Sequence, residues 1–147
     1  MLKSEAQQIK GGAYLSELGN KDENGTVAFE WQGKLINTFE LRDWSHSLTI
    51  NFKSGYQDST TNVVDNSTGK NKDIRLDVAP HVTYDWQTTF TPLNSTTIAL
   101  GILNLTDVKP PFVFSQGGEN RGQEIGWDGR YYDPRGRTAY LNATYNF

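Results

Sequence analysis

The most regular feature of this sequence is an alternation of apolar and polar residues over positions 74–90. Successive side chains of a β-strand point to opposite faces, so a period of two predicts a strand with one apolar and one polar face. The apolar set is Ile74, Leu76, Val78, Val82, Tyr84, Trp86 and Phe90; the polar set is Arg75, Asp77, His81, Thr83, Asp85, Gln87 and Thr89. Pro80 interrupts the alternation and predicts a bulge or a locally unpaired site.

The same period recurs in four other segments. We expect strands near residues 26–41, 44–57, 73–90, 97–106 and 136–147. Apolar residues occupy odd positions up to Leu41 and even positions from Trp44, and this change of phase predicts a tight hairpin at Arg42-Asp43. The sequence therefore predicts an all-β fold, an antiparallel up-and-down meander of about five long strands.

Strand length and the order of connections favour a transmembrane β-barrel. The longest predicted strands exceed the roughly 3–10 residues usual in globular proteins, and a tilted strand needs about 9–11 residues to cross the hydrocarbon. Short connections (42–43 and 91–96) alternate with long ones (57–72 and 108–135), as periplasmic turns alternate with extracellular loops in outer-membrane barrels. Aromatic residues gather at the strand ends expected at one membrane interface: Phe39, Trp44, Trp86, Phe90, Tyr145 and Phe147.

The barrel hypothesis specifies which side chains face lipid. We expect Val27, Phe29, Leu48, Ile50, Val82, Tyr84, Trp86, Leu100 and Leu141 on one solvent-exposed face, and Arg75, Asp77, His81, Asp85 and Gln87 on the other. The alternative is a soluble β-sandwich, in which the large apolar residues pack against a second sheet.

The composition is compatible with a barrel. Only 35% of residues are hydrophobic and the mean hydropathy is −0.64, but in a barrel only alternate residues face lipid. There is no apolar run of 18 or more residues, so we expect no transmembrane helix, and the first residues carry no apolar stretch typical of a secretory signal. The chain has no Cys and a net charge of −3, without a basic patch, so we expect no thiolate metal site and no nucleic-acid partner.

Catalytic chemistry is not indicated. His46 and His81 lack the neighbours of a nucleophilic triad, and no zinc-protease spacing occurs. Asp77, His81 and Asp85 share one strand face and are interpreted as a hydrated, lumen-facing row rather than a metal or acid–base site. We therefore predict a protein that is not an enzyme and has no cofactor or metal.

One long loop is a candidate for ligand contact. Trp127, Asp128, Tyr131 and Tyr132 lie within residues 108–135, and loops carry function disproportionately. Aromatic residues on extracellular loops can hold sugars or siderophore rings. The alternative is that Gly126-Trp127-Asp128-Gly129 forms only a turn.

Several segments together resemble the C-terminal β-barrel segment of TonB-dependent outer-membrane receptors. Residues 76–111 are similar to the family's penultimate hairpin, and the matching positions are Asp85, Gln87, Phe90, Asn104, Leu105, Asp107, Pro110 and Pro111. Residues 132–137 resemble the approach to the family's last strand, and residues 44–58 an earlier strand followed by Gly-Tyr-x-Asp. Leu141, Tyr145 and Phe147 resemble the C-terminal signal read by the barrel assembly machinery. Thr106 stands where the family often has an aromatic residue.

The resemblance implies a receptor for active uptake of a scarce solute of the siderophore, cobalamin or carbohydrate class, in the bacterial outer membrane. Its expected partners are outer-membrane lipid, the barrel assembly machinery, a small-molecule substrate, and the TonB complex through missing N-terminal parts. Since plug domain and earlier strands are absent, we expect a fragment, with residues 1–25 as a polar loop segment and 26–147 as the C-terminal barrel strands. The alternatives are a complete small outer-membrane barrel of structural or adhesive role and a soluble β-sandwich binding module.

Overall fold

The computed structural model describes residues 5–6, 15–22, 25–93, 95–114 and 126–146. The chain divides into two compact units that interleave along the sequence. Unit 1 comprises residues 1–32, 53–81 and 110–132, and unit 2 comprises residues 33–52, 82–109 and 133–147. Every helix-or-strand element in the described ranges is a strand, which confirms the all-β prediction. No helix in these ranges is long and apolar enough to cross a membrane.

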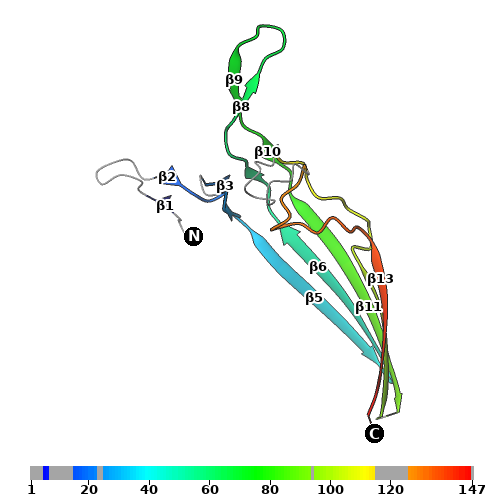
Figure 1. Ribbon diagram of the computed structural model, residues 1–147. Helices are drawn as coiled ribbons and strands as arrows, with labels where there is room; N and C mark the ends of the chain where they lie inside the picture. Colours follow the sequence, from blue (N-terminus) through cyan, green and yellow to red (C-terminus); the bar gives the residue numbers. More distant parts are fainter. Residues whose placement is uncertain (1–4, 7–14, 23–24, 94, 115–125, 147) are drawn as a thin grey trace. The chain divides into compact units, whose positions relative to one another are not determined.

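Unit 2 is built on a five-stranded sheet whose long strands run side by side (Figure 1). Its strands are β5 (Gln32–Leu41), β6 (Trp44–Lys53), β11 (His81–Leu93), β12 (Thr96–Leu103) and β13 (Thr138–Tyr145). Their order, β13-β12-β11-β6-β5, joins each strand to its predecessor in the sheet. The predicted five-stranded meander is therefore present, as an open sheet with β5 and β13 at its edges.

The register places the apolar residues of neighbouring strands opposite one another. On β11 and β12, Trp86 pairs with Ile102 and Phe90 with Ile98. On β12 and β13, Leu100 pairs with Leu141. A register shift between Phe90 and Leu93 marks a bulge around Pro92, which lacks the N–H that a ladder needs.

One face of this sheet is apolar and largely exposed. Among the large residues of its strands, Phe39, Leu41, Trp44, Phe52, Trp86, Leu93, Ile98, Leu100, Leu141 and Tyr145 are exposed. Leu48, Ile50, Val82 and Tyr84 are half-buried. Within unit 2 the described residues provide no second sheet to cover this face, so the packing expected of a β-sandwich is not found here.

Three predicted long strands are shorter than expected, because their outer ends belong to unit 1. Segment 26–41 divides into β4 (Val27–Ala28) and β5; 44–57 into β6 and β7 (Tyr56–Gln57); and 73–90 into β9 (Asn71–Ile74), β10 (Asp77–Val78) and β11. Between β5 and β4, the Trp31 backbone N–H bonds to the Ser54 side chain instead of a ladder carbonyl, at 3.3 Å. Pro80, which has no N–H, separates β10 from β11.

Unit 1 contains a small four-stranded sheet in the order β10-β7-β3-β4. The strand β3 (Asn20–Lys21) lies inside the segment predicted as loop, and it pairs parallel with β7. Buried residues Val27, Tyr56, Val78, Val113 and Tyr132 form the core, with Phe29, Leu76 and Tyr131 packed against it. The prediction that Val27 and Phe29 lie on the exposed apolar face is wrong, because these two side chains pack in the core of unit 1.

Two short hairpins complete the described strands. One pairs β1 (Glu5–Ala6) with β2 (Leu15–Ser16), again within the predicted loop segment 1–25. The other pairs β8 (Thr61–Val64), which lies inside the predicted loop 57–72, with β9, which begins in that loop and continues into the predicted strand 73–90. The turn between β8 and β9 contains Asp65, whose Oδ1 accepts hydrogen bonds from the hydroxyl and the backbone N–H of Ser67. These bonds hold the pKa of the Asp65 carboxyl below its usual value.

Candidate functional site

Asp85, the first residue of the predicted family motif, joins three strands of unit 2. Its Oδ2 accepts a 2.8 Å hydrogen bond from Asn51 Nδ2 on β6. Its Oδ1 accepts a 2.8 Å hydrogen bond from the backbone N–H of Asn104, directly after β12. Asn51 also donates to Thr83 on β11 at 3.2 Å. A carboxylate offers two acceptor oxygens, and here each meets a donor from a different neighbouring strand.

Asn104 forms the turn that ends β12. Its φ of 50° lies in the left-handed region, which Asn tolerates better than most residues. Its buried side chain donates to Val108 O at 2.9 Å and accepts from Val108 N at 3.0 Å. The backbone N–H of Leu105 donates to Tyr84 O on β11 at 2.7 Å. The motif residues Asn104 and Leu105 thus hold this turn on β11 through their backbone N–H groups.

Asp107 connects this turn to the segment before β13. Its Oδ1 accepts from the backbone N–H of Arg137 at 2.8 Å and from Lys109 Nζ at 3.2 Å. These contacts, the Arg137 bond first, hold the pKa of the Asp107 carboxyl below its usual range. Gly136 has a φ of +72°, and a Cβ placed on it would lie 2.5 Å from the same oxygen. Glycine is therefore required at 136 both by backbone conformation and by space.

The structure brings together part of the predicted motif. Asp85, Asn104, Leu105 and Asp107 share one hydrogen-bonded region. Pro110 and Pro111 follow in unit 1, where both are partly buried. Sequence reasoning identified these positions by resemblance, and it included Gly136 and Arg137 in the segment that resembles the approach to the last strand. It did not identify Asn51, whose contact with Asp85 depends on how β6 and β11 pair.

On the last strand, Leu141 and Tyr145 stand on the apolar face, as predicted. Leu141 pairs with Leu100 and Tyr145 with Thr96 of β12. Both side chains are exposed, Leu141 by 71% and Tyr145 by 60%. Phe147, the third residue of the predicted assembly signal, lies outside the described residues, and its role stays a prediction.

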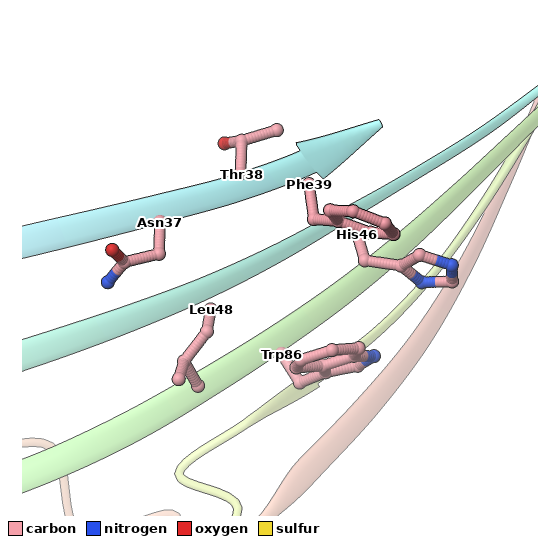
Figure 2. A pocket seen from close by; sticks show the side chains of 6 residues that line it. All are labelled: Asn37, Thr38, Phe39, His46, Leu48 and Trp86. Carbon is pink, nitrogen blue, oxygen red and sulfur yellow. The ribbon is translucent and has the colours of Figure 1, made fainter. Parts of the chain in front are cut away.

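A shallow hollow of about 480 Å³ lies on the apolar face of unit 2. It is lined by Asn37, Thr38 and Phe39 from β5, His46 and Leu48 from β6, and Trp86 from β11. In Figure 2, Asn37 and Phe39 leave β5 on the opposite side from Thr38. The His46 ring stacks on Trp86, with ring centroids 5.7 Å apart. The hollow combines aromatic surfaces with one imidazole, a combination that the sequence pattern did not single out.

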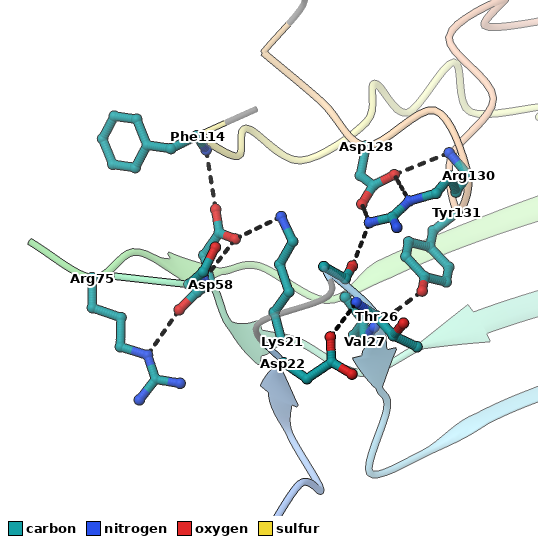
Figure 3. A network of polar contacts seen from close by, with 12 residues as sticks. Lys21, Asp22, Thr26, Val27, Asp58, Arg75, Phe114, Asp128, Arg130 and Tyr131 are labelled. Atoms are coloured by element: carbon teal, nitrogen blue, oxygen red, sulfur yellow. Dashed lines mark hydrogen bonds and ion pairs between the residues drawn. The ribbon is translucent and has the colours of Figure 1, made fainter. Parts of the chain in front are cut away.

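In unit 1, a buried ion pair organises the small sheet (Figure 3). Lys21 Nζ lies 3.0 Å from Asp58 Oδ1, and both side chains are fully buried. Asp58 also accepts from the backbone N–H groups of Ser59 at 2.9 Å and Phe114 at 3.1 Å. The backbone carbonyl of Asp58 accepts from Arg75 Nε at 2.8 Å. A buried charge needs a partner and further hydrogen bonds, and Asp58 has both.

The predicted ligand-contact segment is largely internal to unit 1. Asp128 is fully buried and forms an ion pair with Arg130, whose Nη2 also donates a hydrogen bond to the Gly25 carbonyl (Figure 3). Tyr132 is in the core, while Trp127 and Tyr131 are half-buried. Ligand contact by Trp127, Asp128, Tyr131 and Tyr132 stays a prediction; of the four, Trp127 and Tyr131 are only half-buried, whereas Asp128 and Tyr132 are buried.

Burial and charge act in opposite directions on the Asp128 carboxyl. Desolvation by itself raises its pKa, but the hydrogen bonds from Arg130, together with the charges of Arg130 and Lys21, outweigh this and leave the pKa below its usual range. For Tyr132, burial and then the nearby charge of Asp128 raise the pKa to about 12. Its hydroxyl is buried and has no hydrogen-bond partner among the residues that the structure describes.

The candidate metal-binding and acid–base residues are spread out or already engaged. In the part of the chain that is described, no group of three His, Cys, Asp or Glu side chains is placed to hold a metal ion. Of the predicted polar row, Asp85 is hydrogen-bonded to Asn51 and Asn104, and the His81 ring packs edge-on against the Tyr132 ring, with ring centroids 5.1 Å apart.

Comparison of the chain with protein-family models, with curated proteins and with solved structures gives no match.

Proposed function

We propose that this chain supplies C-terminal strands of an outer-membrane β-barrel of the TonB-dependent receptor class, which takes up a scarce solute of the siderophore, cobalamin or carbohydrate class. The observation that carries the proposal is the open antiparallel meander of unit 2, with its exposed apolar face. Water-exposed apolar area this extensive is unfavourable in a soluble monomer, whereas lipid is its natural solvent.

Strand dimensions support a membrane span. β5 and β6 have 10 residues each, β11 has 13, and β12 and β13 have 8 each. A tilted membrane strand has about 9–11 residues across the hydrocarbon. At one end of the sheet the connections are short: Arg42-Asp43 joins β5 to β6, and β12 begins at Thr96, close in sequence to the end of β11 at Leu93. The other connections, which follow β6 and β12, are long, as extracellular loops are.

The two sheet edges support a larger assembly. In the described residues, β5 pairs only with β6, and β13 only with β12. Long unpaired edges promote aggregation unless further strands cover them. We infer that earlier strands of the barrel pair with β5 and β13 and that the barrel assembly machinery recognises Leu141, Tyr145 and Phe147.

The motif network supports the choice of receptor class. Asp85, Asn104 and Asp107 are residues of the resemblance, and they form one hydrogen-bonded turn rather than lying scattered. In this proposal the turn sets where β12 ends and where the chain approaches β13. The TonB complex would act through a plug domain, and the solute would bind on the side of the long connections.

Reconstitution tests the membrane part of the proposal. The chain, unfolded in urea, is diluted into detergent-free buffer or into phospholipid vesicles carrying brominated acyl chains. We expect β-structure by circular dichroism and quenching of Trp fluorescence only with vesicles, because Trp44 and Trp86 lie on the apolar face. A folded, soluble monomer in buffer would contradict the proposal.

The receptor class has a separate test. The reading frame upstream of Met1 should encode a plug domain and further alternating strands. A frame that encodes an unrelated soluble domain would contradict the receptor proposal while leaving the membrane result intact.

A further inference from the structure

His46 is a polar residue on the apolar face of unit 2, surrounded by aromatic rings. Its imidazole stacks on Trp86 on one side, and Trp44 lies parallel to it at 6.2 Å. Trp44 in turn stacks on Phe90 at 4.3 Å. A hydrogen-bonding side chain among exposed apolar groups is costly in hydrocarbon unless it finds a partner.

Thr88 is the hydrogen-bond partner of one of the two imidazole nitrogens of His46. Trp86 Nε1 donates to Thr88 Oγ1 at 3.0 Å, since an indole nitrogen is only a donor. The Thr88 hydroxyl still has its own hydrogen to donate, and His46 Nδ1 lies 3.0 Å away. The Thr88 hydroxyl can donate its hydrogen to Nδ1 or accept one from it; in the tautomer in which Nδ1 accepts, the ring hydrogen is on Nε2.

In that tautomer, Nε2 presents a donor to the surroundings. Nε2 makes no hydrogen bond to any residue in the described part of the chain. His46 lines the hollow with Phe39, Leu48 and Trp86 (Figure 2), so an apolar chain can lie beside the donor. His46 is two residues into β6, about 7 Å along the strand from its first residue Trp44.

We propose that His46 carries its ring hydrogen on Nε2 and that the hollow binds a glycerophospholipid, with Nε2–H donating to an ester carbonyl of the lipid and an acyl chain packed on Phe39, Leu48 and Trp86. This inference rests on the proposed membrane location. The ester carbonyl is an uncharged acceptor at the boundary between acyl chain and head group, so it can reach a donor within an apolar surround. The phosphate lies further out, in water.

A comparison of a diester lipid with its diether analogue isolates the contribution of the ester carbonyl to binding. Vesicles are made from dioleoyl phosphatidylcholine or from its diether analogue, which keeps the chains and the phosphate but lacks both carbonyls. The partition coefficient of the full chain is measured in each by Trp fluorescence. A net hydrogen bond of ordinary strength predicts about three- to tenfold weaker partition into diether vesicles.

Two variants make the assignment specific. His46→Phe keeps an aromatic ring but removes the donor, so it should partition equally into both lipids. Trp44→Phe removes an indole donor on the same face but outside the lining of the hollow, so it should keep the diester preference. In vesicles with carbonyl-¹³C lipid, solid-state NMR should show a contact between His46 Nε2 and the ester carbon in the unmodified chain.

The outcomes distinguish this inference from the proposed function. Equal partition of the unmodified chain into both lipids, a diester preference that survives His46→Phe, or an NMR contact to phosphorus without one to the carbonyl would each overturn the lipid site while leaving membrane insertion intact. Failure to enter either vesicle would overturn both.

Discussion

The ring of Tyr140 on β13 lies directly over Gly101 on β12, its partner in the register, and fills the space that a side chain at 101 would need. The Tyr140 hydroxyl continues across the sheet and donates a 2.7 Å hydrogen bond to Gln87 Oε1 on β11. One side chain thus spans three strands on the polar face. An aromatic ring covering a glycine on the neighbouring strand is a known means of stabilising sheets.

Gly101→Ala should destabilise the large sheet, because the added Cβ would overlap the Tyr140 ring. We expect a loss of about 1–3 kcal/mol in the free energy of unfolding, the usual range for overpacking. Urea unfolding of the vesicle-inserted chain, followed by circular dichroism, measures it. Gly33→Ala on β5 is the matched control, since a Cβ there meets nothing within 4 Å. Equal unfolding midpoints for the two variants would contradict the close approach of Tyr140.

Asp85→Asn should weaken the junction of β6, β11 and β12. The amide retains one acceptor oxygen but turns an NH2 group toward a donor, either Asn51 Nδ2 or the Asn104 N–H. We expect a cost of about 1–3 kcal/mol, because one donor loses its acceptor. Hydrogen exchange should report it as faster amide exchange at Asn104. Asp77→Asn, at an exposed strand position, is the control and should leave exchange at Asn104 unchanged.

Tyr131 and Tyr132 are adjacent in unit 1 but should respond oppositely to loss of the hydroxyl. Tyr131→Phe removes the hydroxyl that accepts a 3.0 Å hydrogen bond from the Val27 backbone N–H and should cost about 0.5–1.5 kcal/mol. Tyr132→Phe removes a buried hydroxyl with no partner in the described ranges, so stability should stay equal or rise. Hydrogen exchange of the β3 and β4 amides measures both. A larger loss for Tyr132→Phe than for Tyr131→Phe would show that the Tyr132 hydroxyl has a partner.

Unit 1 should lose stability in acid through Asp128. Its pKa is lower in the folded state than in the unfolded chain, where an aspartate titrates near about pH 4. The stabilising contribution is therefore fully present above about pH 4 and is lost as the pH falls through the lower, folded value. Amide exchange of residues 126–132, measured from neutral pH down to about pH 2 and corrected for its intrinsic pH dependence, follows this loss.

Asp128→Asn should flatten this acid dependence and should already be less stable at neutral pH. The control is Asp133→Asn, which breaks an exposed pair with Arg135 and should change little at physiological salt, because solvent screens such pairs. An acid dependence unchanged by Asp128→Asn would assign it to other carboxyl groups.

Much of unit 2 could be predicted from the sequence, because its information is local. The period of two assigns each side chain to a face without any knowledge of the partner strand, and the phase change at Arg42-Asp43 marks the first hairpin. Leu141 and Tyr145 were placed on the apolar face for the same reason. The order of the five strands follows because each long strand pairs with its predecessor.

The contacts of unit 1 and the side-chain networks were decided only by the tertiary structure. Val27 continues the alternation of β5 as well as any residue of the exposed apolar face, yet it is buried, because segments far apart in sequence meet around it. Lys21 and Asp58 are 37 positions apart, and no local sequence pattern around either residue predicts that they pair. Tyr140 and Gly101 become neighbours only through the register of β12 and β13. Alternation specifies which face a residue takes, whereas the partner across a sheet or a core depends on how distant segments align, which no local pattern encodes.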